Sequence, residues 1–451
     1  MTTPIDTGRY GSPQMRALFT DRARYEAFVR VEGALAKAQG SLGVIPRESA
    51  EVIAERARTH RCSVERIAEL EETSRHELFA AVHEFAESCG THGAWVHYGA
   101  TSSDILDTAL ALQLSEAIAL LEENLRDLLT ALMARIDAAG DHVMIGRTHG
   151  QQAQPVTLGF KLAIVLDRFV RCLERLTQAK ERIVMGKIAG AVGSLAGIGA
   201  RGPEVQRAAL RELGLPEPAV CAQAVARDRI AEFFCWAGLT AACLEDLATE
   251  IRNLQRTEIG EVAEPFAEGG QIGSSAMPHK RNPVRSERVC SLARLVRSLV
   301  GPALENVTSW HERDLANSAN ERFTLPEACV LLDEMLTTTT FVIDGLRVFP
   351  DRMRHNLTHS RNEHLSEAVL LLLVQRGMDR LEAYRLLQEA SGRTEEESVD
   401  MVDALLAHPR LAGRLDREEV RRLAAAGADV GHCRNLAAEA VKRAERIVQG
   451  G

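Results

Sequence analysis

Residues 104–139, DILDTALALQLSEAIALLEENLRDLLTALMARIDAA, carry the clearest periodicity in the chain. Apolar residues recur there at spacings of three and four, which places them on one face of an α-helix. At roughly 1.5 Å per residue the helix would be about 50 Å long. Ser102, Ser103 or Asp104 can cap its start, and Gly140 can end it. The apolar positions are Ile105, Leu106, Leu110, Leu114, Ile118, Leu121, Leu125, Leu128, Leu132 and Ile136.

The same periodicity predicts further helices over residues 156–187, 228–262 and 284–307. Another helix is predicted to start at Pro326, because proline suits a first helical turn. Sustained strand alternation is absent, which argues against an α/β sheet fold. Long helices with short links predict an all-α protein built around a helix bundle. Helices of this length are usually covered on several sides, so we expect the bundle to self-associate.

Shorter helices and more charge on both sides of the bundle predict three domains. The first is an N-terminal helical domain, residues 1–103. The second is the central long-helix bundle, residues 104–355, which includes a loop at residues 269–283. The third is a C-terminal helical domain, residues 356–451.

The composition of this 451-residue chain limits its possible partners and its cellular compartment. A net charge of -9 argues against a nucleic-acid partner, which would require a basic face. The longest apolar run, residues 368–374, is far too short to span a membrane, and no signal-peptide pattern opens the chain. Nine cysteines, with no C-x-x-C pair and no zinc spacing, indicate reduced thiols in the cytoplasm. We therefore expect a cytoplasmic protein without a metal.

The sequence GSSAMPHKRNP, residues 273–283, is the most informative chemical motif. Glycines at 269, 270 and 273 allow tight turns and close approach of the backbone to a ligand. Lys280 and Asn282 can both donate hydrogen bonds to a developing oxyanion. The motif predicts a loop that closes over an anionic substrate. The alternative is an exposed linker, since Gly, Ser and Pro mark most loops.

A second patch is GRTHG, residues 146–150, between two predicted long helices. His149 stands beside a hydroxyl and two glycines, and it can move a proton near neutral pH. The alternative is a histidine at a helix end whose ring bonds a backbone carbonyl.

Two more patches suit anions. VHYGATS, residues 96–102, ends at a predicted helix N-terminus, where free amides and two hydroxyls can bind a carboxylate or phosphate. Plain helix capping would need only one of these hydroxyls. Arg313, Ser318 and Arg322 offer two guanidiniums and a hydroxyl, a set that suits a phosphate if the segment folds back on itself. Arginines solvated on a helix face are the alternative.

Together these motifs resemble the fumarase/aspartase superfamily. The form of the loop with Ala276 and His279-Lys280-Arg281 is most similar to adenylosuccinate lyase. The resemblance runs over nearly the whole chain, although 3-carboxymuconate cycloisomerases share much of the loop. It is carried by residues 9–13, 75–76, 95–104, 146–150, 273–283 and 310–322.

The resemblance implies an all-helical homotetramer that uses no metal or organic cofactor and builds each site from three subunits. The reaction would be an anti β-elimination that cleaves a C–N bond and releases fumarate. Its substrates would be adenylosuccinate, which gives AMP, and the succinylated aminoimidazole carboxamide ribotide of purine biosynthesis. Ser274 would remove the proton, and Lys280 and Asn282 would hold the aci-carboxylate. His149 would protonate the departing nitrogen, with His76 close by.

The resemblance also implies the substrate-binding residues. Those expected near the succinyl carboxylates are Thr101, Ser102, Thr148, Gln223 and Arg288. Those on the nucleotide-phosphate positions are Arg9, Tyr10, Arg313, Ser318 and Arg322. The remaining members of the set are Arg75, Glu77 and His97.

Several residues depart from the family pattern. Glu77 replaces an aspartate, Ile230 stands where histidine is frequent, and Ala222 replaces a polar residue. Asn362-Glu363-His364 replaces an apolar Gly-Leu-Ile-like run, a change that can alter recognition of the leaving group; a loop that merely faces water is the alternative.

Two other functions stay open. One is a superfamily lyase or cycloisomerase acting on a small aspartate or succinate adduct or on carboxymuconate, including one in secondary metabolism. The other is a catalytically silent helical scaffold, since a fold does not prove a function. Such a scaffold would be free to lose Ser274, Lys280, Asn282 and His149, which are all present.

Overall fold

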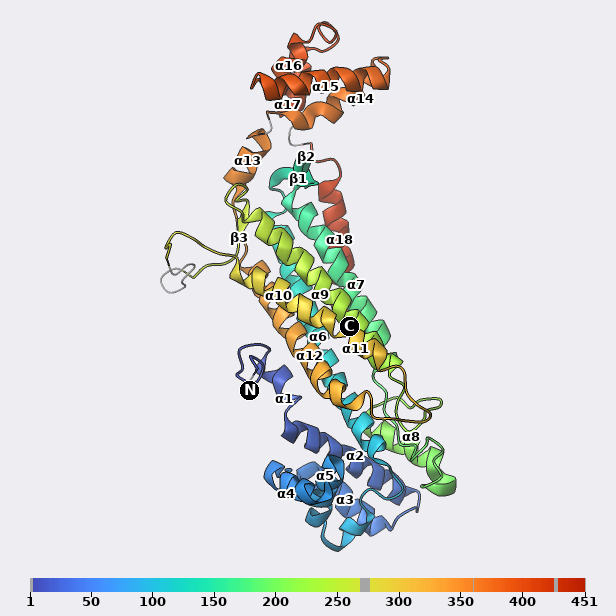
Figure 1. The fold of residues 1–451 in the computed structure, drawn as a ribbon. Coiled ribbons are helices and arrows are strands. Elements are labelled where there is room, and N and C mark those ends of the chain that lie inside the picture. The colour runs from blue at the N-terminus through green and yellow to red at the C-terminus, as the bar shows by residue number, and fades with distance from the viewer. Residues whose placement is uncertain (1–2, 268–275, 360, 426–428, 451) are drawn as a thin grey trace. The chain divides into compact units, whose positions relative to one another are not determined.

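The computed structural model describes residues 3–267, 276–359, 361–425 and 429–450. These residues form long and short α-helices with two small antiparallel sheets, so the all-α prediction is confirmed (Figure 1). No helix in these ranges is long and apolar enough to cross a membrane. The chain divides into two compact units. Unit 1 comprises Met1–Arg126, Arg171–Glu245 and Val289–Thr338, and unit 2 comprises Asp127–Val170, Asp246–Arg288 and Thr339–Gly451.

The N-terminal helices of unit 1 gather in one group (Figure 1). Helix α2 packs closely on α3 because Gly33 and Gly40 lack side chains: a Cβ on them would lie 2.4 Å from that of Ala57 and 2.2 Å from that of Ala50. The elements are α1 (Pro13–Ala17), α2 (Asp21–Ser41), α3 (Arg47–Thr59), α4 (Val64–Ser74), α5 (Glu77–Ser88) and the 3-10 turn η1 (Gly90–Trp95).

The long helices follow. Those that contribute residues to both units are α6 (Ser102–Ala139), α7 (Leu158–Ile183), α9 (Asp228–Leu254), α10 (Val284–Ser298) and α12 (Ser318–Asp344). Shorter elements of unit 1 are η2 (Gly199–Arg201), α8 (Gly202–Leu213) and α11 (Val300–Glu305). The predicted apolar face of α6 is confirmed, since its members are buried except Leu106 and Leu110. These two leucines line a cavity of unit 1 instead.

Several predicted helix limits change. The helix predicted to reach residue 262 ends at Leu254, and the one predicted over 284–307 breaks into α10 and α11. The predicted start at Pro326 is wrong, because α12 begins at Ser318 and contains Pro326 in its interior. Proline cannot donate a backbone hydrogen bond, but burial of Leu325 and Ala328 on either side holds the helix through it.

Unit 2 contains a β-hairpin that the periodicity did not predict. Strands β1 (Val143–Thr148) and β2 (Gln151–Thr157) pair antiparallel, and Thr148 faces Gln151 across a two-residue turn. The turn residues His149 and Gly150 have φ angles of 55° and 77°, the positive values that a type I′ turn requires. A second pair, β3 (Val262–Ala263) and β4 (Arg347–Val348), is too short to produce a recognisable alternation.

The rest of unit 2 is helical. Helices α14 to α17 form one group around buried residues that include Val369, Leu373, Met401 and Leu405 (Figure 1). The elements are α13 (Pro350–His359), η3 (Glu363–Leu365), α14 (Ser366–Gln375), α15 (Arg380–Glu396), α16 (Met401–Ala407), α17 (Arg417–Ala425) and α18 (Cys433–Gln449).

Candidate active site

The predicted site residues divide between the two units. Ser274 lies outside the described residues, and the predicted loop at 269–283 is described only from Ala276. Those in unit 1 are Arg9, Tyr10, Arg75, His76, Glu77, His97, Thr101, Ser102, Gln223, Arg313, Ser318 and Arg322. Those in unit 2 are Thr148, His149, Lys280, Asn282 and Arg288.

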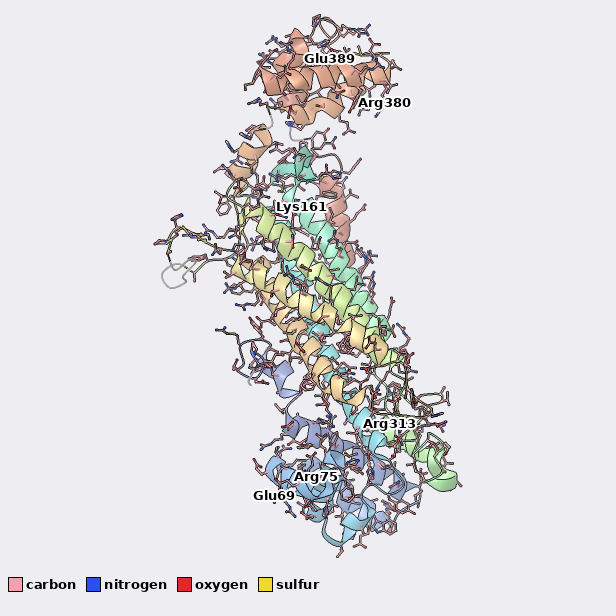
Figure 2. All side chains as sticks on the ribbon, in the orientation of Figure 1. Glu69, Arg75, Lys161, Arg313, Arg380 and Glu389 are labelled. Atoms are coloured by element: carbon pink, nitrogen blue, oxygen red, sulfur yellow. The ribbon has the colours of Figure 1, made fainter. Side chains whose placement is uncertain are left out.

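His76 stands at the junction of α4 and α5. It directly follows Arg75, which is labelled in Figure 2 and has a left-handed conformation with a φ of 53°. The ring caps α5: the backbone N–H of Phe79 donates to its Nδ1 over 3.2 Å. Because Nδ1 accepts this bond, the proton of the neutral ring lies on Nε2. Nε2 is 3.4 Å from the hydroxyl oxygen of Ser102. The helix cap therefore orients the imidazole towards Ser102.

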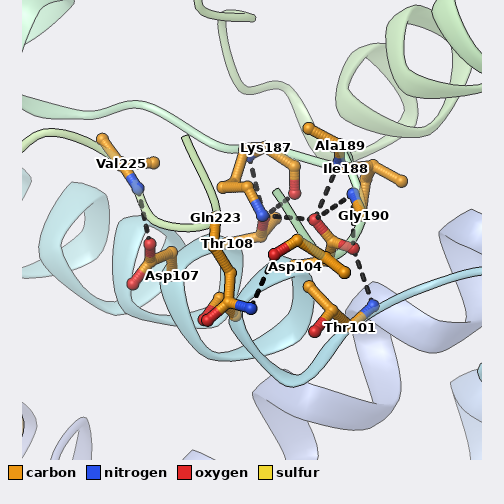
Figure 3. A network of polar contacts seen from close by, with 12 residues as sticks. Thr101, Asp104, Asp107, Thr108, Lys187, Ile188, Ala189, Gly190, Gln223 and Val225 are labelled. Atoms are coloured by element: carbon orange, nitrogen blue, oxygen red, sulfur yellow. Dashed lines mark hydrogen bonds and ion pairs between the residues drawn. The ribbon is translucent and has the colours of Figure 1, made fainter. Parts of the chain in front are cut away.

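A buried carboxylate organises the N-terminus of α6 (Figure 3). Asp104 is fully buried and pairs with the fully buried ammonium of Lys187. It also accepts backbone N–H bonds from Thr101, over 2.8 Å, and from Ala189, over 2.7 Å, and Gly190 donates to it as well. A buried ion pair is tolerated only when further hydrogen bonds satisfy its atoms, and these donors do so for Asp104. The pair ties the start of α6 to residues 187–190.

Gln223 is tied to the same region. Its side-chain amide donates to the carbonyl of Ala191 over 2.7 Å, and its backbone N–H donates to the carbonyl of Glu312 over 3.2 Å. Figure 3 shows Thr101 bonded to Asp104 and Gln223 beside this network. Three residues predicted to bind carboxylates, Thr101, Ser102 and Gln223, therefore lie on neighbouring segments of unit 1.

His97 is held by a buried glutamate. Glu32 accepts the backbone N–H of His97 over 3.0 Å and contacts its Nδ1 at 2.6 Å. Burial lowers the pKa of His97, but the charge of Glu32 and its hydrogen bond outweigh burial, and the net shift is upward. With Nδ1 occupied, the ring can reach a ligand only through Nε2.

Three of the predicted phosphate residues, Arg313, Ser318 and Arg322, line one cavity of about 310 Å³ in unit 1. Arg313 donates to the hydroxyl of Ser103 over 2.5 Å, and Ser318 is the first residue of α12. The segment thus folds back as the sequence required. The rest of the predicted set, Arg9 and Tyr10, does not line this cavity but sits on the turn before α1.

The same cavity has charged residues that the sequence did not indicate. Arg227 forms ion pairs with Asp107, at 2.8 Å, and Glu321, at 3.0 Å. Burial raises the pKa of Glu321, and Arg227 partly offsets that rise. Arg24 also lines the cavity, from α2. Arg24 is far in sequence from Arg313, Ser318 and Arg322. No local motif therefore indicated that it lines the same cavity.

In unit 2 the hairpin is anchored below its tip. Arg147 forms two hydrogen bonds of 2.9 Å with Glu261, whose side chain is fully buried, and Asn356 donates to the same carboxylate. Thr148 and His149 at the tip are exposed. The buried contacts of Arg147 therefore hold a hairpin whose tip exposes the catalytic candidate His149 to solvent.

Glu264 anchors the segment that follows the loop at residues 269–283. Its carboxylate accepts the backbone N–H groups of Arg285, over 3.2 Å, and Ser286, over 2.6 Å, at the first turn of α10. Lys280 is exposed, and Asn282 and Arg288 are half-buried. Glu264 thus joins the segment before the loop at residues 269–283 to the start of α10, the helix that follows that loop.

The divergent Asn362-Glu363-His364 segment does not simply face water. Glu363 accepts a hydrogen bond of 2.7 Å from the hydroxyl of Thr394, and Asn362 donates to Asp400 over 2.7 Å. Glu363 and His364 line a cavity of about 690 Å³ in unit 2 together with Thr148. Burial lowers the pKa of His364.

Within the described ranges, His60, Cys62 and Glu84 place potential metal-ligand atoms within 4.8 Å of one another. Their contacts have another explanation, since Glu84 already bonds the His60 ring at 2.8 Å and the backbone N–H of Ser63 at 3.2 Å. Burial, with Glu84 next, raises the pKa of the Cys62 thiol to about 12. The thiol is therefore protonated near neutral pH.

A sequence model of the lyase family matches residues 8–297, and a model of the adenylosuccinate lyase C-terminus matches residues 364–440. The chain belongs to this lyase family. Within the family, adenylosuccinate lyase of Pyrococcus abyssi is 45% identical over 89% of each chain. The enzyme of Pyrococcus horikoshii is 42% identical over 99% of each, and that of Bacillus subtilis is 39% identical over 91% of this chain and 94% of its own.

Solved structures of the family agree with the fold. The 3-carboxy-cis,cis-muconate lactonizing enzyme of Pseudomonas putida has a TM-score of 0.89 at 32% identity, over 99% of this chain and 100% of its own. A fumarate lyase of Mesorhizobium sp. BNC1 has a TM-score of 0.87 at 33% identity, over 98% of each chain. The predicted membership of the fumarase/aspartase superfamily is confirmed, as is the likeness to adenylosuccinate lyases.

Proposed function

We propose that this lyase cleaves adenylosuccinate to AMP and fumarate, and cleaves the succinylated aminoimidazole carboxamide ribotide in purine biosynthesis. The observation that carries this proposal is the 42% identity over 99% of each chain to an adenylosuccinate lyase. The cavity that gathers Arg313, Ser318 and Arg322 supports it, because a nucleotide substrate needs cations for its phosphate.

The proposed reaction begins with Ser274, which removes the proton next to a carboxylate. Negative charge then spreads onto that carboxylate, where Lys280 and Asn282 hold it. Losing one such donor typically costs about 2.7–4 kcal/mol of barrier. His149 then protonates the departing nitrogen, and its exposed position at the hairpin tip supports that role. A serine base requires strong positive potential and exclusion of water, for which Lys280 and a closing loop are the candidates.

His76 acts beside the acid and keeps its Nε2 proton directed at Ser102. The proposed carboxylate contacts come from the hydroxyls and amide of Thr101, Ser102 and Gln223, with Thr148 and Arg288 completing the grip. The Asp104–Lys187 pair supports this assignment because it fixes the backbone on which Thr101 stands. Preorganised donors of this kind reduce the reorganisation needed in the transition state.

The proposed phosphate contacts are Arg313, Ser318 and Arg322, together with Arg9 and Tyr10. Ser318 opens a 27-residue helix, and Arg322 lies one turn further on. The positive end of a helix dipole adds to the two guanidiniums at that point. The further members of the substrate-binding set are Arg75, Glu77 and His97.

We also propose the assembly and its setting. The chain forms a cytoplasmic homotetramer whose sites take residues from three subunits, without a metal or organic cofactor. Exposed apolar side chains on long helices, such as Leu239, Leu295 and Phe341, support self-association. The three-domain organisation, 1–103, 104–355 and 356–451, remains part of this proposal.

A second candidate function is elimination or cycloisomerisation of a small aspartate or succinate adduct, or of carboxymuconate. Two observations favour it. The TM-score to a muconate lactonizing enzyme is 0.89, and Glu363 and His364 line a cavity together with Thr148. Charged residues at that position would change which leaving group fits.

The deciding experiment is a spectroscopic assay of the purified protein with adenylosuccinate that follows AMP and fumarate together. We expect stoichiometric release, abolished in Ser274→Ala. Arg322→Ala should raise KM strongly for this phosphorylated substrate. If adenylosuccinate is not turned over while fumarate is released from another aspartate adduct, the second function holds. If no adduct releases fumarate and carboxymuconate is not cyclised, the scaffold alternative holds.

A further inference from the structure

Two arginines from distant parts of the sequence share one carboxylate in unit 1. Glu77 Oε2 accepts a hydrogen bond from Arg24 Nη2 over 3.0 Å and forms an ion pair with Arg322 Nη2 at 2.7 Å. Arg24 belongs to α2, Glu77 opens α5, and Arg322 lies in the second turn of α12. The three side chains tie three helices together at one point.

The shared carboxylate is better protected than its partners. The side chain of Glu77 is 13% exposed, whereas those of Arg24 and Arg322 are 26% and 46% exposed. As the first residue of α5, Glu77 also lies in the favourable field of the helix N-terminus. Glu77 is thus the fixed member of the group. Both guanidiniums keep N–H donors available for a ligand. Further support comes from Phe28, whose ring centroid lies 5.6 Å from the guanidinium carbon of Arg24.

Both arginines line the cavity of about 310 Å³ that also contains Arg313 and Ser318. The full lining has four arginines (Arg24, Arg227, Arg313 and Arg322) and three acidic residues (Asp21, Asp107 and Glu321), and Glu77 supplies a fourth carboxylate, so the formal charges balance. Because Arg227 is paired with Asp107 and Glu321, the guanidiniums that can contact a phosphate ester, which carries about -1.5 to -2 at pH 7, are those of Arg24, Arg313 and Arg322.

Without the carboxylate, the two guanidiniums would repel each other. Burial lowers the pKa of Arg24 and the charge of Arg322 lowers it further, whereas Glu77 raises it. The glutamate therefore makes it possible for two like charges to occupy one wall of the cavity.

We propose that Glu77 is a positioning residue that holds Arg24 and Arg322 as a pair, and that Arg24 is an additional residue of the phosphate subsite. The identity of the phosphorylated ligand rests on the proposed function, but binding of a phosphate group does not. A purely structural role is the competing explanation, in which Arg24 only connects α2 to α5.

The first test measures binding of inorganic phosphate to the full-length protein by isothermal titration calorimetry. Arg24→Gln removes one charge-assisted contact and should weaken binding about tenfold. Arg22→Gln is the matched control, because Arg22 is exposed on the same helix and does not line the cavity. Wild-type protein that binds no phosphate at millimolar concentration, or equal binding by wild type and Arg24→Gln, would overturn the proposal.

The second test compares adenylosuccinate with its dephosphorylated nucleoside. Arg24→Gln and Glu77→Gln should each raise KM about tenfold for the phosphorylated substrate, with kcat within about twofold, and leave the nucleoside unaffected. Glu77→Asp keeps the charge and should recover part of the loss. Equal effects on both substrates would show a structural role and reject the positioning role.

The calorimetric and kinetic tests distinguish failure of the proposed function from failure of the role proposed for Arg24. If the wild type binds phosphate but does not turn over adenylosuccinate, the proposed function fails, and the calorimetric comparison of Arg24→Gln with Arg22→Gln still decides the role of Arg24. If adenylosuccinate is turned over but Arg24→Gln behaves like Arg22→Gln in both assays, the proposed function stands and the role of Arg24 is rejected.

Discussion

The N-terminus of α6 and the tip of the β1–β2 hairpin both carry predicted site residues, but they are held in different ways. At α6, the buried Asp104–Lys187 pair fixes Thr101 from below. At the hairpin, the buried contact between Arg147 and Glu261 lies below the tip, and His149 stands on an exposed turn. The difference agrees with the roles proposed for Thr101 and His149, since carboxylate binding needs preorganised donors, whereas a proton donor must reach the leaving group.

The largest expected effect comes from His149→Asn. Asparagine tolerates the left-handed conformation of the turn, so the hairpin should remain while the proton donor is lost. The rate of adenylosuccinate cleavage should fall about 10²- to 10⁴-fold, with little change in Tm. The measurement is kcat, paired with a thermal melt. A variant with near wild-type kcat would remove His149 from the role of general acid.

Next is Lys187→Met, which leaves the buried Asp104 charge without its partner. Breaking a buried pair in this way costs about 3–5 kcal/mol of folding free energy. Unfolding in urea at fixed protein concentration measures the loss. The double variant Asp104→Asn with Lys187→Met is the control and should recover much of it. A single variant within about 1 kcal/mol of wild type would show that the pair does not dominate this region.

Gly150→Ala examines the hairpin backbone alone. The residue has a φ of 77°, and a Cβ there would meet no atom within 4 Å. The expected loss is therefore conformational strain without a clash, about 1–2 kcal/mol. Comparing Tm with that of Gly150→Asn, which should be less affected, isolates the strain. Equal losses in both variants would indicate that the turn conformation is not the cause.

The smallest effect concerns His97, which Glu32 links to α2. Because the pKa of His97 is raised on folding, its stabilisation is complete below its unfolded value of about 6.5 and is lost as the pH rises through the higher folded value. The difference in Tm between wild type and His97→Asn should therefore shrink between pH 5.5 and pH 9. A difference that grows over this range would mean that burial outweighs Glu32.

Parts of the fold and site were predictable because their signals are local. The apolar period of α6, the Thr101-Ser102 start and the GRTHG motif each occupy one continuous stretch. Burial of eight of the ten predicted apolar positions of α6 followed from that period alone. The predicted helix start at Pro326 was wrong because packing on both sides of this residue outweighed the local preference of proline for a first turn.

The sequence by itself determined the helical class, the family and the residue types that can perform an elimination, because periodicity and motif spacing are properties of short segments. Only the tertiary structure decided which charges meet. Arg24, Glu77 and Arg322 lie on three helices far apart in the chain, and Asp104 meets Lys187 across 83 positions. Such pairs depend on how helices pack, and packing brings together side chains whose neighbours in sequence give no sign of their partners.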